Sequence, residues 1–168
     1  MPRVAIPEAL HPTLQFRYTV FTTKLPTAVI HARSAQQPSF DNAPVTIEHK
    51  NGYFKVKGKT RWNDITLSCY QFEGITAKEL WRYLNKHHQR VSSATDNYAH
   101  EYKHLMQLII LNPMGLPVGV WMLHGAFISN ASWGELDWAV DDIAQCDITI
   151  SYDFAELDGL SDLIGGLF

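Results

Sequence analysis

An alternating stretch from Tyr53 to Tyr70 constrains the fold more than any other part of the chain. It reads YFKVKGKTRWNDITLSCY. Apolar or small residues occupy the even positions from Phe54 to Trp62, and Lys or Arg occupies the odd positions between them. Strand side chains point alternately to the two faces of a sheet, so the pattern predicts a strand with one buried face and one basic, solvated face.

The alternation changes at Asn63-Asp64. After this pair the apolar residues Ile65, Leu67 and Cys69 stand at odd positions. A slip of one residue would turn the core face of a strand outward, so we expect a bulge or bend that re-aims the chain. Nothing in the stretch indicates catalysis.

Further strands are expected on both sides of this stretch. Each is a short run rich in aliphatic, β-branched or aromatic residues and bounded by proline, glycine or polar residues. They cover residues 14–21, 27–33, 105–111, 118–124 and 147–154. The last alternates most clearly and is expected to bury Ile148, Ile150, Tyr152 and Phe154.

A long hairpin is expected before the central strand. Gln36–Pro44 is polar and bounded by prolines, which predicts a connection, and an extended piece is expected to start at Val45. Asn51-Gly52 is a strong hairpin signal, because both residues tolerate the left-handed backbone of a tight turn. We therefore expect Gln36–Lys57 to stand out from the body.

One helix is expected, over residues 76–90. Thr76 and Glu79 form a capping box, and four residues recur at helical spacing: Leu80, Trp81, Leu84 and His88. Many strands with one helix and no βαβ alternation predict a mainly β fold, an antiparallel sandwich or barrel with one packed α-helix.

Length and composition favour a single soluble domain over residues 1–168. The chain is 46% hydrophobic, its net charge is −3, and it has two cysteines, all compatible with one core and a reduced compartment. Residues 1–13 are expected to form an arm, and residues 157–168 a C-terminal extension. We expect no signal peptide and no membrane span.

His100-Glu101-Tyr102-Lys103-His104 matches the H-E-x-x-H pattern of zinc peptidases. On a helix, this spacing places both imidazoles on one face and leaves the Glu as general base. Here the motif runs into the β-like sequence LMQLIIL. In a strand, the two histidines would lie roughly 13 Å apart, too far to share one zinc. We therefore expect no metal site, although the metallopeptidase stays open as a distant alternative.

Weaker constellations have ordinary explanations. His87-His88 suits the C-terminal end of a helix, where positive charge is favourable. The four aspartates Asp137, Asp141, Asp142 and Asp147 lack the spacing of a calcium loop, so a solvated acidic face is expected. A basic row on the central strand has no interleaved exposed aromatics, so it indicates an outer face or a protein contact.

Several stretches combine in a recognisable order. Asn51–Tyr70 joins a loop, a basic strand and an acidic bend, Gly125–Trp138 reads GAFISNASWGELDW, and Cys146–Asp153 reads CDITISYD. Between them, Tyr98–Lys103 puts a Tyr-Lys pair before a strand. Together they resemble the tail tube proteins of contractile bacteriophages, over roughly residues 14–156. The chain departs from that pattern in details: Ile65 stands where such proteins tend to have an aromatic residue, and Ile128 where they tend to have proline.

The resemblance implies a structural virion protein rather than an enzyme, with no cofactor. Tail tube proteins form hexameric rings whose inner strands join into one continuous barrel, and the rings stack into the tube through which the phage genome passes. The implied partners are other copies, an outer sheath, baseplate and terminator proteins at the ends, and tape measure protein and DNA in the lumen. The implied location is the virion, with host cytoplasm during assembly.

The projecting hairpin is then the expected contact between rings, through Asn51, Gly52, Tyr53, Lys55 and Lys57. Few cations are expected in the lumen, because phosphate contacts would hold DNA back. Two alternatives within this class are a secretion-system tube and a baseplate-proximal tube initiator. Another class, a monomeric β-barrel that binds a ligand, also remains open.

Overall fold

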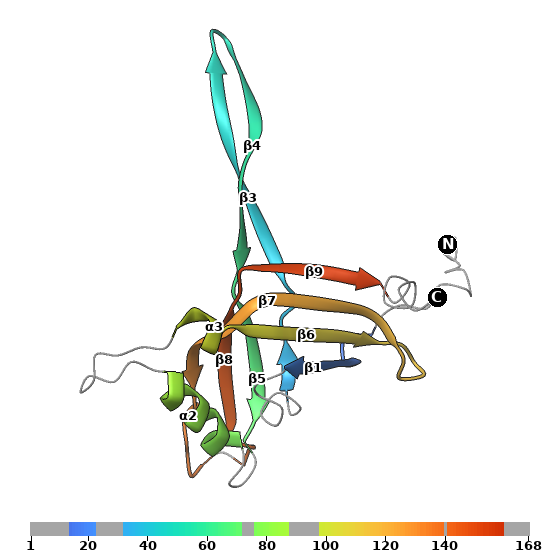
Figure 1. The fold of residues 1–168 in the computed structure, drawn as a ribbon, viewed down its shortest axis with the longest axis vertical. Coiled ribbons are helices and arrows are strands. Elements are labelled where there is room, and N and C mark those ends of the chain that lie inside the picture. Colours follow the sequence, from blue (N-terminus) through green and yellow to red (C-terminus); the bar gives the residue numbers. More distant parts are fainter. Residues whose placement is uncertain (1–13, 23–31, 72–75, 88–97, 140, 160–168) are drawn as a thin grey trace, which may run out of the picture.

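The structure, a computed structural model, describes residues 14–22, 32–71, 76–87, 98–139 and 141–159. Strands dominate this part of the chain, and every strand pairing in it is antiparallel. The expected mainly β class is therefore confirmed (Figure 1).

Nine strands and two helices make up the described residues. In chain order the strands are β1 (Tyr18–Thr22), β2 (Ala32–Ala35), β3 (Ser39–His49), β4 (Gly52–Asn63), β5 (Ile65–Tyr70), β6 (His104–Leu111), β7 (Pro117–Ser132), β8 (Gln145–Ser151) and β9 (Phe154–Gly159). The helices are α2 (Thr76–His87) and the single turn α3 (Ala99–Tyr102), which the sequence analysis did not anticipate.

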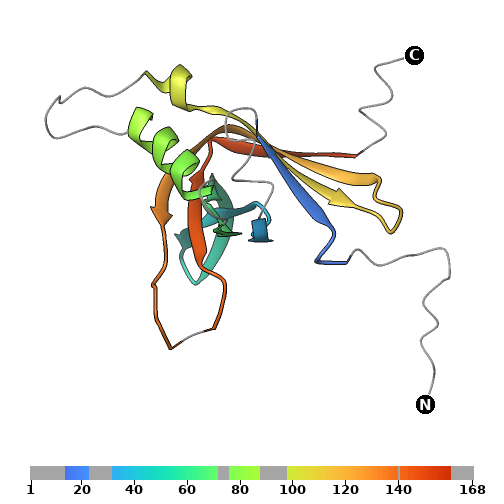
Figure 2. The same ribbon diagram turned by 90° about the horizontal axis from the view of Figure 1, so that it is seen from below.

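Two sheets share the long strand β7. The first sheet has the order β1-β6-β7-β9, and the second has the order β7-β8-β5-β2. Residues up to His124 pair with β9, and residues from Phe127 pair with β8. Figures 1 and 2 show the two sheets at a steep angle, with β7 passing from one to the other at the corner and α2 beside its second half.

The core lies between the two sheets. Its largest fully buried side chains are Ile65, Leu67, Leu80, Met106, Leu123 and Ile148. Cys69 and Cys146 stand opposite each other on β5 and β8, both buried and free. Burial raises the pKa of Cys69 to about 12, so the thiol stays protonated and packs as a small apolar group, as expected.

The expected bend after the central strand is confirmed. β4 ends at Asn63, and β5 begins at Ile65 in a different sheet. Leu67 and Cys69 are buried with Ile65, so the apolar positions do change parity there. At the base of the hairpin, the Trp62 ring packs 5.9 Å from that of Tyr152, with 54° between the ring planes.

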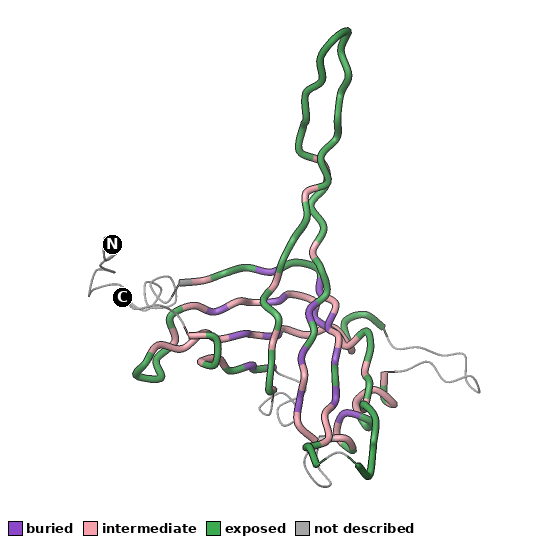
Figure 3. The backbone as a smooth tube through the Cα atoms, turned by 180° about the vertical axis from the view of Figure 1, so that it is seen from behind, coloured by how far each residue is buried: buried purple, intermediate pink, exposed green. Residues whose placement is uncertain are grey.

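β3 and β4 form a long hairpin that leaves the body (Figures 1 and 3). The expected projection is therefore confirmed, but the assignment of Gln36–Pro44 as a connection is wrong, because β3 begins at Ser39. Pro44 pairs with Lys57 in this two-stranded sheet, where each strand is an edge. Proline is tolerated there because an edge strand does not need every N–H for its ladder.

The prediction of a buried face on β4 is wrong. Phe54 is 54% exposed and Val56 is 41% exposed, because nothing in the described residues packs over the outer hairpin. The even positions do not form one face either. Pro44 pairs with Lys57, and Asn42 pairs with Thr60, so two steps along β3 correspond to three steps along β4. The extra residue in β4 is a β-bulge, and it reverses which face the even-numbered side chains point to.

The last alternating segment is interrupted. Ile148, Ile150 and Tyr152 are buried as expected, but Phe154 is 43% exposed and its predicted inward position is wrong. The chain turns at Asp153, whose backbone N–H donates to the carbonyl oxygen of His124 at 2.9 Å. Phe154 then opens β9 on the other sheet.

The expected helix is present as α2 up to His87, and residues 88–90 lie outside the described part. The expected arm (1–13) and most of the expected strand at 27–33 also lie outside it. Of the expected extension at 157–168, the described residues 157–159 belong to β9. No described helix has the length and apolar character needed to cross a membrane.

Candidate assembly surfaces

The outer half of the hairpin presents one apolar face. Val45 stands opposite Val56, and Ile47 stands opposite Phe54. Residues directly opposite in an antiparallel pair lie on the same face, so these four side chains form a cluster. Each is between 41% and 54% exposed. We call this cluster the hairpin apolar face.

The other face and the tip carry the residues singled out from the sequence. Lys55 stands opposite Thr46, and Tyr53 opposite Glu48. The turn itself lies one residue earlier than expected: Lys50, with φ of +47°, and Asn51 connect the closing pair His49–Gly52. Asn51, Gly52, Tyr53, Lys55 and Lys57 are all exposed. Their contact with another ring stays a prediction.

The hairpin has the features of a protein–protein interaction surface. A two-stranded hairpin alone is marginally stable in water. Exposed apolar patches on soluble proteins commonly mark interaction sites. Gly58 shows that the pairing is nevertheless specific, because a Cβ at that position would overlap the carbonyl oxygen of Ala43 on the paired strand.

The first sheet has two open edges, β1 and β9, within the described residues. The register places Phe21, Gln107, Met122 and Glu156 in one row across its four strands. The adjacent row, from Thr22 through Met106 and Leu123 to Ala155, is buried, so the Phe21 row lies on the opposite face.

This sheet carries no Lys or Arg. The strands β1, β6, the first part of β7 and β9 contain two acidic residues, Glu156 and Asp158, and two histidines, His104 and His124. His124 stacks on Phe154 with ring centroids 4.4 Å apart, and its Nε2 lies 3.4 Å from the Glu156 carboxylate. The face opposite the core is therefore apolar to weakly acidic.

The corner between the sheets joins three residues from separate parts of the sequence. Lys103 Nζ lies 2.7 Å from one Asp153 oxygen and 2.8 Å from the other. Gly125 has φ of +66°, and a Cβ there would overlap the Asp153 carboxylate. Each residue belongs to a different stretch that carried the tail tube resemblance, and the structure brings all three together.

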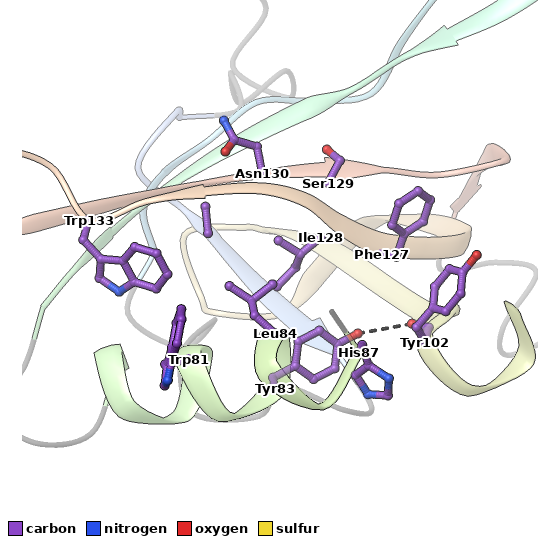
Figure 4. A pocket seen from close by; sticks show the side chains of 11 residues that line it. Trp81, Tyr83, Leu84, His87, Tyr102, Phe127, Ile128, Ser129, Asn130 and Trp133 are labelled. Atoms are coloured by element: carbon purple, nitrogen blue, oxygen red, sulfur yellow. Dashed lines mark hydrogen bonds between the residues drawn. The ribbon is translucent and has the colours of Figure 1, made fainter. Parts of the chain in front are cut away.

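A groove of about 490 Å³ lies between α2 and the second half of β7 (Figure 4). Its walls are mostly aromatic and aliphatic, and Trp81 meets Trp133 with ring centroids 5.9 Å apart. The Tyr83 hydroxyl donates to the carbonyl oxygen of Tyr102 at 3.2 Å. Burial raises the pKa of Tyr83 to about 12, so this phenol remains a donor.

The H-E-x-x-H residues do not share a helix. His100 and Glu101 belong to the single turn α3, whereas His104 is the first residue of β6. His104 Nδ1 lies 3.0 Å from the Tyr102 carbonyl oxygen, and His100 stacks on Tyr98. Among the described residues, no group of three or more His, Cys, Asp or Glu side chains is arranged to hold a metal ion. The helical geometry that the zinc hypothesis requires is absent from this segment.

No family model and no curated protein sequence matches the chain. Solved structures do share its fold. A chain from the cap of the anti-feeding prophage, described as its tube-terminating cap, has a TM-score of 0.71 at 19% identity, with 94% of this chain and 96% of that chain covered.

Two other assemblies contain similar chains. One, from the sheath–tube complex of an extracellular contractile injection system called PVC, has a TM-score of 0.71 at 20% identity and covers 90% of this chain and 95% of that chain. The other, from the six-fold symmetrised baseplate of the anti-feeding prophage, has a TM-score of 0.70 at 13% identity and covers 90% and 98%. The tail tube-like fold expected from the sequence is therefore confirmed by its likeness to chains of contractile injection systems.

Proposed function

We propose that this chain is a structural subunit of the tube of a contractile tail, closing into hexameric rings that stack end to end. The single observation that carries the proposal is the first sheet with its open edges β1 and β9. Its four strands are joined by three antiparallel pairings, so β1 and β9 run in opposite directions.

Ring closure follows from this arrangement. β9 of one copy pairs antiparallel with β1 of the next, and repetition around an axis closes the sheets into one barrel. Closure satisfies edge hydrogen bonds that would otherwise be a template for aggregation. The six-fold symmetrised baseplate that contains a similar chain supports six copies as the ring size.

The face opposite the core then lines the lumen. The row of Phe21, Gln107, Met122 and Glu156 lies on this face, and the four strands hold no Lys or Arg. Such a surface offers no cationic contact to phosphates, so the genome can slide through. Tape measure protein and DNA would be the occupants of this channel.

The hairpin makes the contact between rings. Five exposed residues lie at its tip or along its outer half: Asn51, Gly52, Tyr53, Lys55 and Lys57. A sheath surrounds the tube, and baseplate and terminator proteins bind its ends. This accords with the sheath–tube, baseplate and cap assemblies that contain similar chains.

Two alternatives, a tube of a secretion system and a baseplate-proximal initiator, would share this fold. A tube subunit would be located in the virion or particle. Within the described residues, the one candidate catalytic motif, H-E-x-x-H, is split between α3 and β6. The structural role is therefore the function that the geometry supports best.

Negative-stain electron microscopy of the concentrated protein tests the proposal. We expect wild-type rings and tubes with an open channel. The double variant Lys55→Glu/Lys57→Glu should form rings but few tubes, because the exposed charge at the stacking contact is reversed. Lys78→Glu/Arg82→Glu, which reverses two exposed charges on α2, is the matched control and should stack normally.

Two results would contradict the proposal in different ways. A wild-type protein that stays monomeric at high concentration would count against the tube. Tubes of normal length from Lys55→Glu/Lys57→Glu would remove the basic residues of the hairpin from the contact between rings.

A further inference from the structure

The loop between β7 and β8, described over residues 133–139 and 141–144, lies at the opposite end of the molecule from the hairpin tip (Figure 1). The register explains this position. β4 runs from the tip into the body, and β5 continues it, starting opposite Ile150 and ending at Tyr70 opposite Gln145. The loop ends immediately before Gln145. We call it the β7–β8 loop.

Apolar side chains project from the β7–β8 loop into solvent. Trp138 is fully exposed, Leu136 is 83% exposed and Ile143 is 58% exposed. Covering such side chains with a partner does not disturb the fold, and their removal from water is favourable in free energy. These three define an apolar surface that the body of the same copy does not cover.

The polar side chains of this loop are all acidic. Its four carboxylates are exposed and belong to Glu135, Asp137, Asp141 and Asp142. Three of the four aspartates expected on a solvated acidic face lie in this loop, whereas the fourth, Asp147, lies in β8. Two of the carboxylates shape the loop, because Asp137 accepts from the N–H of Ala139 and Asp142 from its neighbour Ile143.

The base of the loop is held by one side chain. Gln71 Nε2 lies 3.0 Å from the carbonyl oxygen of Trp133 and 2.9 Å from that of Gln145. The N–H of Gln71 also donates to Ala144 at 2.9 Å. Gly134 has φ of +67°, so it permits a turn that other residues adopt at a cost. The loop is therefore presented in a defined position.

The hairpin has the complementary character. Residues 39–63 contain five Lys or Arg and two acidic residues, a net charge of 5 − 2 = +3, whereas the described loop residues carry four carboxylates and no Lys or Arg, a charge of −4. The hairpin apolar face also matches Leu136, Trp138 and Ile143 in chemistry. The two surfaces therefore offer each other both apolar contact and opposite charge.

We propose that the hairpin of one copy docks on the β7–β8 loop of a copy in the adjacent ring. This inference rests on the proposed tube. At about 3.3 Å per residue, the 12 residues of β4 extend roughly 40 Å, twice the length of the six-residue β5. A contact between two different surfaces at opposite ends repeats without closing, which generates a filament.

The groove beneath α2 is the competing receiver. It is apolar and could accept the hairpin apolar face, but its lining contains no Asp or Glu. It therefore offers no counter-charge to Lys55 and Lys57. The β7–β8 loop supplies both kinds of contact, and for that reason we favour it.

Disulfide trapping tests the contact in assembled tubes. A chain carrying Asn51→Cys and Leu136→Cys should give a ladder of covalent oligomers on mild oxidation. The control chain carries Asn51→Cys with Trp81→Cys, which places the second thiol at the α2 groove, where Trp81 is 56% exposed, and it should stay monomeric on a denaturing gel. The native Cys69 and Cys146 are buried, so they contribute no background in the folded protein.

Charge exchange supplies a second readout. Glu135→Lys/Asp141→Lys avoids the two carboxylates that cap the loop, and it should reduce tube yield at least tenfold. Adding Lys55→Glu/Lys57→Glu to the same chain should restore most of that yield, because both signs are then exchanged. Trp138→Ala should shorten tubes without changing the midpoint of thermal unfolding, since that side chain is fully exposed.

The outcomes separate the docking contact from the tube. If the wild-type protein forms tubes, three results would overturn the docking and leave the tube intact. They are no ladder from the chain with the Leu136 cysteine, a ladder from the chain with the Trp81 cysteine, and no rescue by the exchanged charges. Absence of rings and tubes from the wild-type protein would overturn the tube itself, and the docking with it.

Discussion

The β3–β4 hairpin and the β2–β5 pair of the second sheet are two halves of one β-ribbon, one exposed and the other part of the core. β3 pairs with β4, β2 pairs with β5, and only Asp64 separates β4 from β5. The connection between β2 and β3 continues the ladder, because the N–H of Gln36 donates to Thr66 at 3.1 Å. Yet Ile65 in β5 is 1% exposed, whereas Phe54 in β4 is 54% exposed.

The difference lies in what packs against each half. β5 lies between β8 and β2, and side chains of the first sheet and of α2 complete the core around it. Among the described strands, β3 and β4 pair only with each other, and none of the described residues packs over their outer halves. Alternation in a sequence therefore predicts that a segment forms a strand, but whether the apolar face of that strand is buried depends on the element that packs against it. An alternating strand without a partner in its own chain marks a surface that another copy can cover.

The largest expected effect is in the second sheet. Leu67→Ala removes a side chain that is 1% exposed and leaves a cavity among residues of both sheets. We expect a loss of about 2–5 kcal/mol in the free energy of unfolding, measured by urea titration of the monomer. A loss below about 1 kcal/mol would show that the core rearranges to fill the space.

The corner between the sheets should respond less strongly. Gly125→Ala combines φ of +66° with overlap of the new Cβ and the Asp153 carboxylate, which would break the ion pair to Lys103. We expect a loss of about 1–3 kcal/mol. Gly119→Ala in the same strand is the matched control, because its Cβ would make an ordinary 3.7 Å contact with Leu157. Equal losses in the two variants would contradict a special requirement at Gly125.

The smallest effect on the isolated subunit should be in the hairpin. Val56→Ala shortens a side chain that is 41% exposed, so the free energy of unfolding should change by no more than about 0.5 kcal/mol. The same variant should shorten tubes seen by electron microscopy, since Val56 belongs to the hairpin apolar face. If Val56→Ala instead destabilised the monomer as much as Leu67→Ala, the contrast between the two halves of the ribbon would disappear.

Much of the fold could be read from local patterns. The bend near Asp64, the helix over α2 and the buried positions of β8 follow from periodicity and turn residues, which depend on neighbours along the chain. The hairpin tip was located to within one residue by Asn51-Gly52. The tail tube likeness also pointed to Lys103, Gly125 and Asp153 as separate features.

Long-range geometry could not be read in this way. The bulge opposite Asn42 and Pro44 reverses the faces of β4, and nothing in the sequence of β4 alone reveals the pairing that creates it. Phe154 continues the alternation of β8, but a hydrogen bond from Asp153 to His124 turns the chain into another sheet. The exposed Leu136 and Trp138 gave no periodic signal, because they lie in a loop.

The near-continuity of β4 and β5 has a mechanical consequence. A pull on the hairpin tip along the long axis enters the body through β5, in the middle of the second sheet rather than at its edge. The force then runs parallel to the strands and loads the six residue pairs between β5 and β8 in shear, all together instead of one after another. Axial tension is thus distributed over a whole ladder of hydrogen bonds. A subunit with this arrangement resists extension along that axis better than it resists peeling at β1 or β9.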